Sequence, residues 1–455
     1  MAEILSVRAF LSRARVVRVR DARRVTHTMK RSVSAIPATG GNLSTTHGVA
    51  LYVGAVLGTG VIALPALAAR AAGPASLVAW LGLVVASVPL AVTFAALAAR
   101  YPDSGGVSTY ARRAFGPRAA AAVGWWFFAA VPAGAPAAAL FAGGYVEAAF
   151  GGGETTVYLT VLGLFIVVAI ANYFGVRVSG RMQLILAGVL VTLLVVAAVA
   201  ALPQADLGNL RPFAPHGWLA VGSAAALLVW SFAGWEAVTY LAAEFRNPPR
   251  SLPRATAAAI VIVGGLYLAI AAASILVLGA SAGSTDAPLA ELLGRSFGEP
   301  AKAVAAIVAL LLTLGVMNTY YAGAAKLGAA LGRDGALPAS LALGSRAGEV
   351  PRRSLLLTVA LGLVGFAIVA LTGVGTDSLV LATTGSFVAV YAVGAVAALR
   401  LLPRRTAAWW TALAAVGMVL MMLAATGAYL LWPLLVGGSS LAYVRGRRRR
   451  MAGGS

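Results

Sequence analysis

Long apolar runs separated by short polar turns dominate the chain between His47 and Val444. Twelve of these runs are each long enough to cross a bilayer, which takes about 20 helical residues. The third, sixth and eighth are longer than a minimal crossing, so we expect them to tilt or to project beyond the bilayer. We place the twelve spans near residues 47–72, 75–99, 118–149, 155–173, 183–203, 217–245, 255–280, 300–330, 354–373, 378–400, 407–425 and 427–444.

The first span contains a stretch that is poor helix material. Gly58 and Gly60 flank Thr59, and Pro65 follows shortly after,. Lipid offers no hydrogen bonds, so turn-like backbone inside a membrane occurs only where it is buried in protein or lines a polar cavity. The pattern favours two readings: a broken helix whose freed backbone groups hold a small charged ligand, or glycines that let a neighbouring helix approach.

The sixth span contains a second unusual stretch, Trp230-Ser231-Phe232-Ala233-Gly234-Trp235-Glu236. Glu236 is the one acidic residue that we place deep inside a span. A mid-membrane carboxylate is costly and is by default a candidate for function. The alternative is a neutral glutamic acid that joins helices by hydrogen bonds.

The two unusual spans are five apart, so spans 1–5 and 6–10 read as two sets of five. An odd number of spans in each set inverts the second set in the membrane. Interrupted helices at matching positions of two halves are the best sequence indication of a transporter binding site. We therefore predict an all-α membrane protein with twelve transmembrane helices, arranged as a 5+5 inverted repeat with two peripheral helices.

The composition agrees with this fold class. Of 455 residues, 60% are hydrophobic and only 11% are charged, whereas soluble proteins carry about 25% charged residues. The absence of cysteine excludes disulfides and thiolate metal sites,. The three histidines, His27, His47 and His216, are too scattered in the sequence for a metal cluster, and we expect neither a metal nor a cofactor.

The formal charge of +21 reflects membrane topology rather than nucleic-acid binding. The predicted spans place 31 of the 35 lysines and arginines on the side of the membrane where the N-terminus lies. This bias is the positive-inside pattern, and it predicts both termini in the cytoplasm, facing anionic inner-leaflet lipid. The remaining four fall on the opposite side: Arg70, Arg211, Arg295 and Lys302.

These features divide the chain into four predicted parts. A basic cytoplasmic tail at residues 1–46 lacks the features of a cleavable signal peptide,. The sequence leaves open whether residues 1–28 belong to the native protein, since Met29 heads a more ordinary lead-in. The ten-helix core follows at 47–405, two additional helices at 406–444, and a basic cytoplasmic tail at 445–455.

Four blocks in order resemble the amino acid–polyamine–organocation transporters. They are the stretch from Gly54 to Ile62 with Pro65, the loop Tyr101-Pro102-Asp103-Ser104-Gly105-Gly106 and its continuation to Phe115-Gly116, the segment Phe232–Glu236 with its exit through Glu244-Phe245-Arg246-Asn247-Pro248 to Ala255, and Asp334-Gly335-Ala336-Leu337-Pro338. Within the family, Val131-Pro132-Ala133-Gly134-Ala135-Pro136-Ala137-Ala138 is most similar to the bacterial subfamily that exports methionine and branched-chain amino acids.

The resemblance implies a substrate site at the two interrupted helices. It implies that the α-carboxylate of an amino acid meets backbone N–H groups at Gly58, Thr59 and Gly60, where a half-helix N-terminus favours an anion. It implies that the α-ammonium meets backbone carbonyls around Trp230, Ser231 and Ala233, and that Glu236 couples protons. The complete predicted binding set is Leu57, Gly58, Thr59, Gly60, Trp230, Ser231, Phe232, Ala233 and Gly234.

Together with these features, the resemblance implies a secondary amino acid transporter of the bacterial inner membrane, with protons as the coupling ion and export of neutral apolar amino acids such as methionine, leucine, isoleucine and valine. Apart from Glu236, the predicted lining carries no charge to pair with a charged substrate side chain. Direction cannot be read from sequence, so an importer or exchanger is the alternative. A lipid-acting membrane enzyme is disfavoured because the spans lack an acid or histidine cluster, and a channel because no ring of charges is present.

Overall fold

Helices account for the fold of the residues described by the computed structural model, which are 43–102, 106–175, 180–236, 239, 242, 245–344 and 349–452. Within these ranges the one β contact is a single bridge between Leu43 and Phe245. The helices of the first half are α2 (Thr45–Leu57), α3 (Gly60–Ala72), α4 (Ser76–Arg100), α5 (Gly106–Phe115), α6 (Pro117–Phe150), α7 (Gly153–Tyr173) and α8 (Gly180–Ala201).

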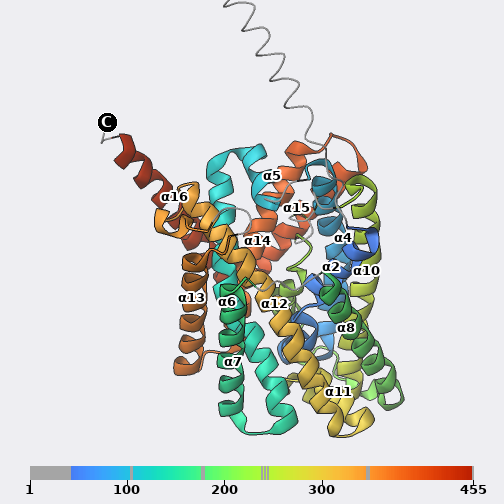
Figure 1. Ribbon diagram of the computed structural model, residues 1–455. Helices are drawn as coiled ribbons and strands as arrows, with labels where there is room; N and C mark the ends of the chain where they lie inside the picture. Colours follow the sequence, from blue (N-terminus) through green and yellow to red (C-terminus); the bar gives the residue numbers. More distant parts are fainter. Residues whose placement is uncertain are drawn as a thin grey trace, which may run out of the picture. The chain divides into compact units, whose positions relative to one another are not determined.

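Further helices follow α8 along the chain (Figure 1). They comprise α9 (Ala220–Leu228), the 3₁₀ turn η4 (Val229–Phe232), α10 (Pro248–Ala273), α11 (Pro288–Phe297), α12 (Pro300–Arg333), α13 (Arg352–Thr372) and α14 (Thr376–Leu401). Two final helices, α15 (Ala407–Thr426) and α16 (Leu431–Ala452), follow them.

Nine helical stretches within the described ranges are long and apolar enough to cross a membrane. Two of them, Thr45–Arg100 and Ala407–Arg447, each contain two of the twelve predicted spans. The predicted sixth span contains a shorter apolar helix, Ala220–Ser231. The prediction of an all-α polytopic membrane protein is confirmed at this level, and the count of twelve stays a prediction.

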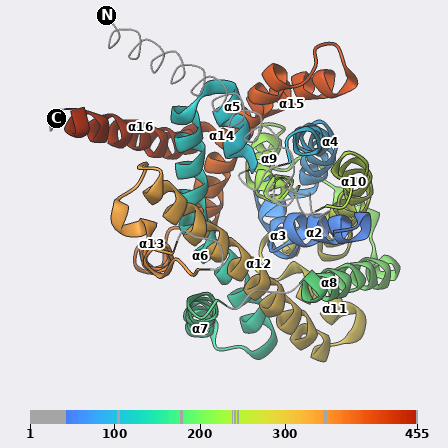
Figure 2. The same cartoon turned by 45° about the horizontal axis from the view of Figure 1, so that its top comes forward.

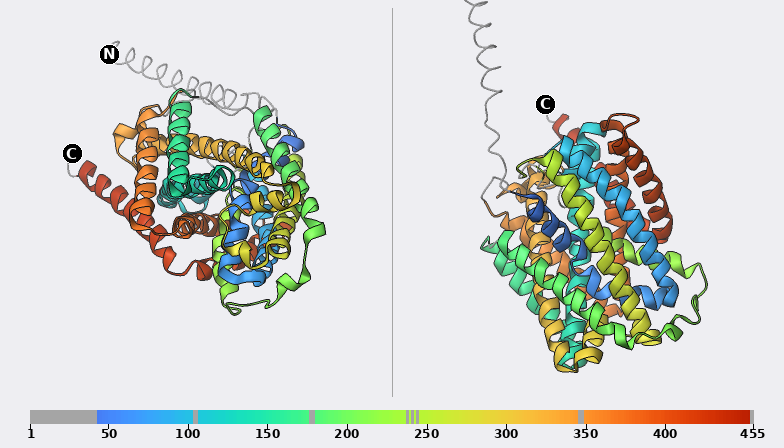
Figure 3. Two further views of the ribbon diagram at one scale, coloured as in Figure 1. Left: turned by 90° about the horizontal axis from the view of Figure 1, so that it is seen from below. Right: turned by 90° about the vertical axis from the view of Figure 1, so that its right-hand side faces the viewer.

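The long helices lie side by side as parallel and antiparallel rods (Figure 3). On one flank α10 packs against α2 and α4, and α9 packs against α3 and α4. On the other flank α6 and α12 cross in extensive contact and are backed by α7 and α13 (Figure 2). Both α6 and α12 begin with a proline, whose missing N–H costs nothing at that position,.

Burial divides the helices as a bilayer requires. Every residue of α3 from Gly60 to Ala69 is buried in protein, so this helix contacts neighbours on all sides. In contrast, α7 exposes large apolar side chains, including Leu159, Ile166 and Ile170. Exposed aliphatic side chains on a helix of this hydropathy suit contact with lipid chains rather than water.

Candidate functional site

The chain of the first span is interrupted between α2 and α3. Gly58 adopts φ 32° and ψ −140°, a left-handed conformation that glycine tolerates and other residues resist,. Thr59 then caps α3 without a side-chain hydrogen bond. The first N–H groups of a helix have no acceptor within the helix, so the start of α3 presents backbone donors at the break.

Two buried tyrosines donate to carbonyls on either side of this break. The Tyr267 hydroxyl of α10 donates to the Val56 carbonyl at 2.6 Å, at the end of α2. The Tyr145 hydroxyl of α6 donates to the Ile62 carbonyl at 2.7 Å and accepts from the Leu289 N–H at 3.1 Å. Because an unpaired buried carbonyl is costly, these bonds stabilise the broken backbone.

The sixth span is interrupted where η4 ends. Ala233 leaves the helical region with ψ 119°, and Gly234 has φ 126°. A Cβ atom built on Gly234 would lie 2.7 Å from both the carbonyl carbon and the carbonyl oxygen of Ala55 in α2. Only a glycine fits there, and it brings the second break into backbone contact with the first.

Glu236 lies directly after the second break and is 1% exposed. Its Oε2 accepts a hydrogen bond from the Tyr391 hydroxyl of α14 at 2.7 Å and another from the Gly234 N–H at 3.0 Å. The side chain is therefore held between α14 and the broken backbone. The structure joins an acidic group to the backbone turn whose shape depends on Gly234.

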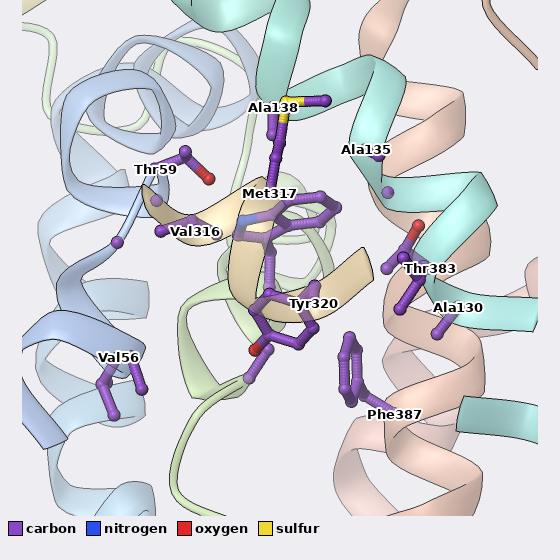
Figure 4. A pocket seen from close by; sticks show the side chains of 17 residues that line it. Val56, Thr59, Ala130, Ala135, Ala138, Val316, Met317, Tyr320, Thr383 and Phe387 are labelled. Atoms are coloured by element: carbon purple, nitrogen blue, oxygen red, sulfur yellow. The ribbon is translucent and has the colours of Figure 1, made fainter. Parts of the chain in front are cut away.

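A hollow opens where the two breaks meet α6, α12 and α14 (Figure 4). Its space free of protein atoms, the open mouth included, is about 570 Å³. The close-up shows Thr59 and Val56 on one side, Met317 and Tyr320 in the middle, and Thr383 and Phe387 opposite. The lining comprises Ala55, Val56, Gly58, Thr59, Gly60, Ala130, Val131, Gly134, Ala135, Ala138, Trp230, Ala233, Val316, Met317, Tyr320, Thr383 and Phe387.

The lining is mostly apolar, with a few polar groups. No charged side chain lines the hollow among the residues that the structure describes. The polar side chains are Thr59, Thr383, Tyr320 and the indole of Trp230. Such a surface accepts an apolar side chain and offers a charged one no partner.

The structure brings five of the predicted binding residues to the hollow: Gly58, Thr59, Gly60, Trp230 and Ala233. The first break contributes three of them and the second contributes two. Their roles toward a ligand stay predictions.

Three predicted binding residues, Leu57, Ser231 and Gly234, and the predicted coupling residue are not in the lining of the hollow. Leu57 is fully buried beside it. Ser231 donates its hydroxyl to the Leu228 carbonyl at 2.6 Å, inside its own turn. Gly234 contacts Ala55 instead, and the side chain of Phe232 lies outside the described part of the chain. Glu236 is likewise absent from the lining, because it turns toward Tyr391.

Ten residues of α6, α12 and α14 line the hollow and are missing from the sequence-based set. On α6 they are small, and a Cβ on Gly134 would lie 3.0 Å from Thr383 Cγ2 and 3.1 Å from Trp230 Cη2. The proline-rich stretch in α6 supported only the resemblance to a subfamily, and no pattern marked the residues of α6, α12 or α14 as part of the site. The ten are Ala130, Val131, Gly134, Ala135, Ala138, Val316, Met317, Tyr320, Thr383 and Phe387.

No cluster of three or more histidine, cysteine or acidic side chains occurs within the described ranges. The site therefore consists of backbone groups, hydroxyls and apolar side chains. This arrangement suits a small molecule that has polar groups to bind the exposed backbone and an apolar part to contact the apolar side chains.

Known proteins resemble this chain over most of its length. Residues 43–442 match the amino acid permease family. The chain is 31% identical to the uncharacterized amino acid permease YecA of Bacillus subtilis, over 88% of this chain and 94% of that protein. It is 31% identical to the L-methionine/branched-chain amino acid exporter YjeH of Escherichia coli, over 80% and 87%, and 29% identical to the branched-chain amino acid permease BcaP of B. subtilis, over 64% and 67%.

Proposed function

Because the chain belongs to the amino acid permease family, we propose that it exports neutral apolar amino acids in exchange for protons. Membership of this family makes the chain a transporter and not an enzyme. One observation carries the proposal: an uncharged, mostly apolar hollow lies where the two helix breaks meet. Both charged ends of a free α-amino acid need hydrogen-bonding partners. The backbone at the breaks supplies donors and acceptors without a charged side chain.

The α-carboxylate of the substrate binds at the start of α3. Gly58, Thr59 and Gly60 line the hollow, and the first-turn N–H groups of α3 have no acceptor within the helix. The helix dipole favours an anion there. The α-ammonium binds carbonyl groups of η4 near Trp230 and Ala233, which face the same hollow.

The substrate side chain extends over α6 toward α12 and α14. Gly134, Ala135 and Ala138 leave room on α6, and Met317 and Phe387 supply apolar contacts across from them. Methionine, leucine, isoleucine and valine match this surface in size and polarity. The printed names of YjeH and BcaP, an exporter and a permease for such amino acids, agree with this choice.

The twelve-span, inverted-repeat arrangement belongs to the same proposal. Helix packing in one half has a counterpart in the other when each span is exchanged with the one five later. The contact of α2 with α10 corresponds to that of α9 with α4, and the contact of α2 with α8 to that of α9 with α14. The short helices correspond too, because α5 packs on α6 and α14 as α11 packs on α12 and α8.

Glu236 couples transport to protons. It is a buried carboxyl group attached to the second break, so its protonation state affects the backbone that forms the substrate site. The protein lies in the bacterial inner membrane with both termini on the cytoplasmic side. Protons that flow inward through it drive the export of the amino acid against its gradient. An importer or an amino acid exchanger uses the same site and is the alternative.

A counterflow panel in proteoliposomes tests the proposal. Vesicles loaded with unlabelled methionine or leucine should take up labelled methionine, leucine, isoleucine and valine, and should take up little arginine, lysine or glutamate. A pH gradient should accelerate net flux. Equal uptake of arginine and leucine would contradict the apolar site, and uptake that ignores the pH gradient would leave an exchanger.

A further inference from the structure

Three arginines outside the lining of the hollow lie at or near the ends of their helices. Arg100 ends α4, Arg113 lies on α5, and Arg400 is near the end of α14. The guanidinium carbons of Arg100 and Arg113 lie 5.8 Å and 4.7 Å from the centroid of the Tyr101 ring. That of Arg400 lies 4.7 Å from the centroid of the Phe115 ring.

Hydrogen bonds join these three helix ends into one cluster. The Tyr101 hydroxyl donates to the Leu401 carbonyl at 3.1 Å, which ties the end of α4 to α14. Arg400 Nη1 donates to the Ala114 carbonyl at 3.1 Å, which ties α14 to α5. Arg100, Arg113 and Arg400 therefore belong to a single surface, which we call the arginine cluster.

The arginine cluster carries positive charge that nothing described in the structure neutralises. Neighbouring Arg112 pairs with Asp334 at 3.5 Å, but none of the three cluster arginines has a carboxylate partner within the described ranges. All three side chains are exposed. Guanidinium groups stacked on rings are partly ordered and keep N–H donors directed outward, a geometry that matches phosphate.

Exposed aromatic side chains indicate that the cluster lies at a bilayer surface. Phe115 is 36% exposed beside Arg400, and Trp410 is 56% exposed at the start of α15. The Trp409 indole donates to the Leu399 carbonyl at 3.2 Å, so this part of α15 is tied to the end of α14. Tryptophan at helix ends is typical of the membrane–water interface.

We propose that the arginine cluster binds the headgroup of an anionic phospholipid. The phosphate accepts hydrogen bonds from Arg100, Arg113 and Arg400, and the acyl chains follow the exposed apolar face that begins at Trp410. A bound headgroup bridges α4, α5 and α14. A soluble phosphate ion could also contact the arginines, but it would gain nothing from the exposed aromatic side chains. The lipid is therefore favoured as the source of the bound phosphate group.

The test counts lipids bound to the purified full chain in detergent by native mass spectrometry. Phosphatidylglycerol should bind and phosphatidylcholine should not. Arg100→Gln/Arg113→Gln/Arg400→Gln should weaken phosphatidylglycerol binding by roughly a hundredfold, the summed effect of three surface arginines on an anionic headgroup. The control, Arg250→Gln/Arg254→Gln/Arg353→Gln, removes the same charge from other exposed positions and should bind as the wild type does.

Equal losses in the triple variant and its control would overturn the proposal, since they would show only a general charge effect. Displacement of the lipid by millimolar inorganic phosphate would also overturn it, in favour of a soluble-anion site. Arg113→Lys keeps the charge at an exposed position and loses the guanidinium contact with the Tyr101 ring, so it should weaken binding several-fold. Unchanged binding in that variant would overturn the role assigned to the stacked guanidinium.

Discussion

Each of the two helix breaks contains a glycine with a positive φ, but the groups around the two breaks differ. At the first, Gly58 turns the chain, Tyr267 and Tyr145 donate to nearby carbonyls, and Gly58, Thr59 and Gly60 all reach the hollow. At the second, Trp230 and Ala233 reach the hollow, while Gly234 turns away against Ala55. The first break presents backbone to the hollow, and the second divides its residues between the hollow and a carboxyl group.

Under the proposed function, this difference gives the substrate site a route of response to a proton that it does not contact. Glu236 lies outside the lining, yet it accepts from the Gly234 N–H at 3.0 Å, one residue from Ala233 in the lining. A change at the carboxyl group therefore reaches the hollow through the backbone. The first break has no such group among its described neighbours, so we expect the two breaks to respond differently to matched changes.

Alanine at Gly234 should have the largest effect. Its Cβ would lie 2.7 Å from the Ala55 backbone, and its φ of 126° disfavours any side chain,. The two breaks cannot then stay in contact, and substrate binding should be lost. Isothermal titration with methionine or leucine measures this, with Gly54→Ala as the control because its Cβ meets nothing within 4 Å. Wild-type affinity in Gly234→Ala would show that the contact between the breaks is dispensable.

Leucine at Gly58 should abolish binding while leaving the protein inserted. Gly58 lines the hollow and has φ 32°, so the new side chain both fills the carboxylate position and strains the turn. Membrane fractionation checks insertion, and counterflow checks transport. Normal counterflow in Gly58→Leu would mean that the first break serves packing alone.

Glu236→Gln should separate the two breaks by function. The amide keeps the shape and one accepting oxygen but does not titrate. We expect exchange of amino acid for amino acid to continue, because the hollow is unchanged, while acceleration by a pH gradient disappears. Glu147→Gln near the end of α6 is the matched control and should keep its pH response. Proton-driven flux at the wild-type level in Glu236→Gln would remove Glu236 from the coupling mechanism.

Tyr267→Phe should have the smallest effect. It deletes the 2.6 Å hydrogen bond to the Val56 carbonyl, and an unpaired buried acceptor costs about 1–3 kcal/mol. The melting temperature should fall and the substrate affinity should weaken without loss of the pH response. The control is Tyr158→Phe, in the cluster that packs α7 against α12 and α13. A lost pH response in Tyr267→Phe would show that the first break also takes part in coupling.

The sequence by itself determined the fold class, the approximate spans and both interruptions. Apolar runs of bilayer length are visible in the sequence because each membrane span must be long enough and apolar enough to cross the lipid as a helix. Gly58 and Gly234 report backbone angles that other residues resist, and both lie at real breaks. Glu236 was recognisable because a carboxyl group in an apolar run is costly wherever it is placed.

The tertiary structure alone decided which residues share a surface. The lining residues of α6, α12 and α14 are ordinary glycine, alanine, valine, methionine, tyrosine, threonine and phenylalanine, and no local pattern distinguishes them from lipid-facing or core positions. Helix rotation and crossing set them opposite the breaks, through contacts between residues far apart in sequence. The same packing turned Glu236 toward Tyr391 and away from the hollow, because side-chain direction at a broken helix depends on its neighbours and not on its own sequence.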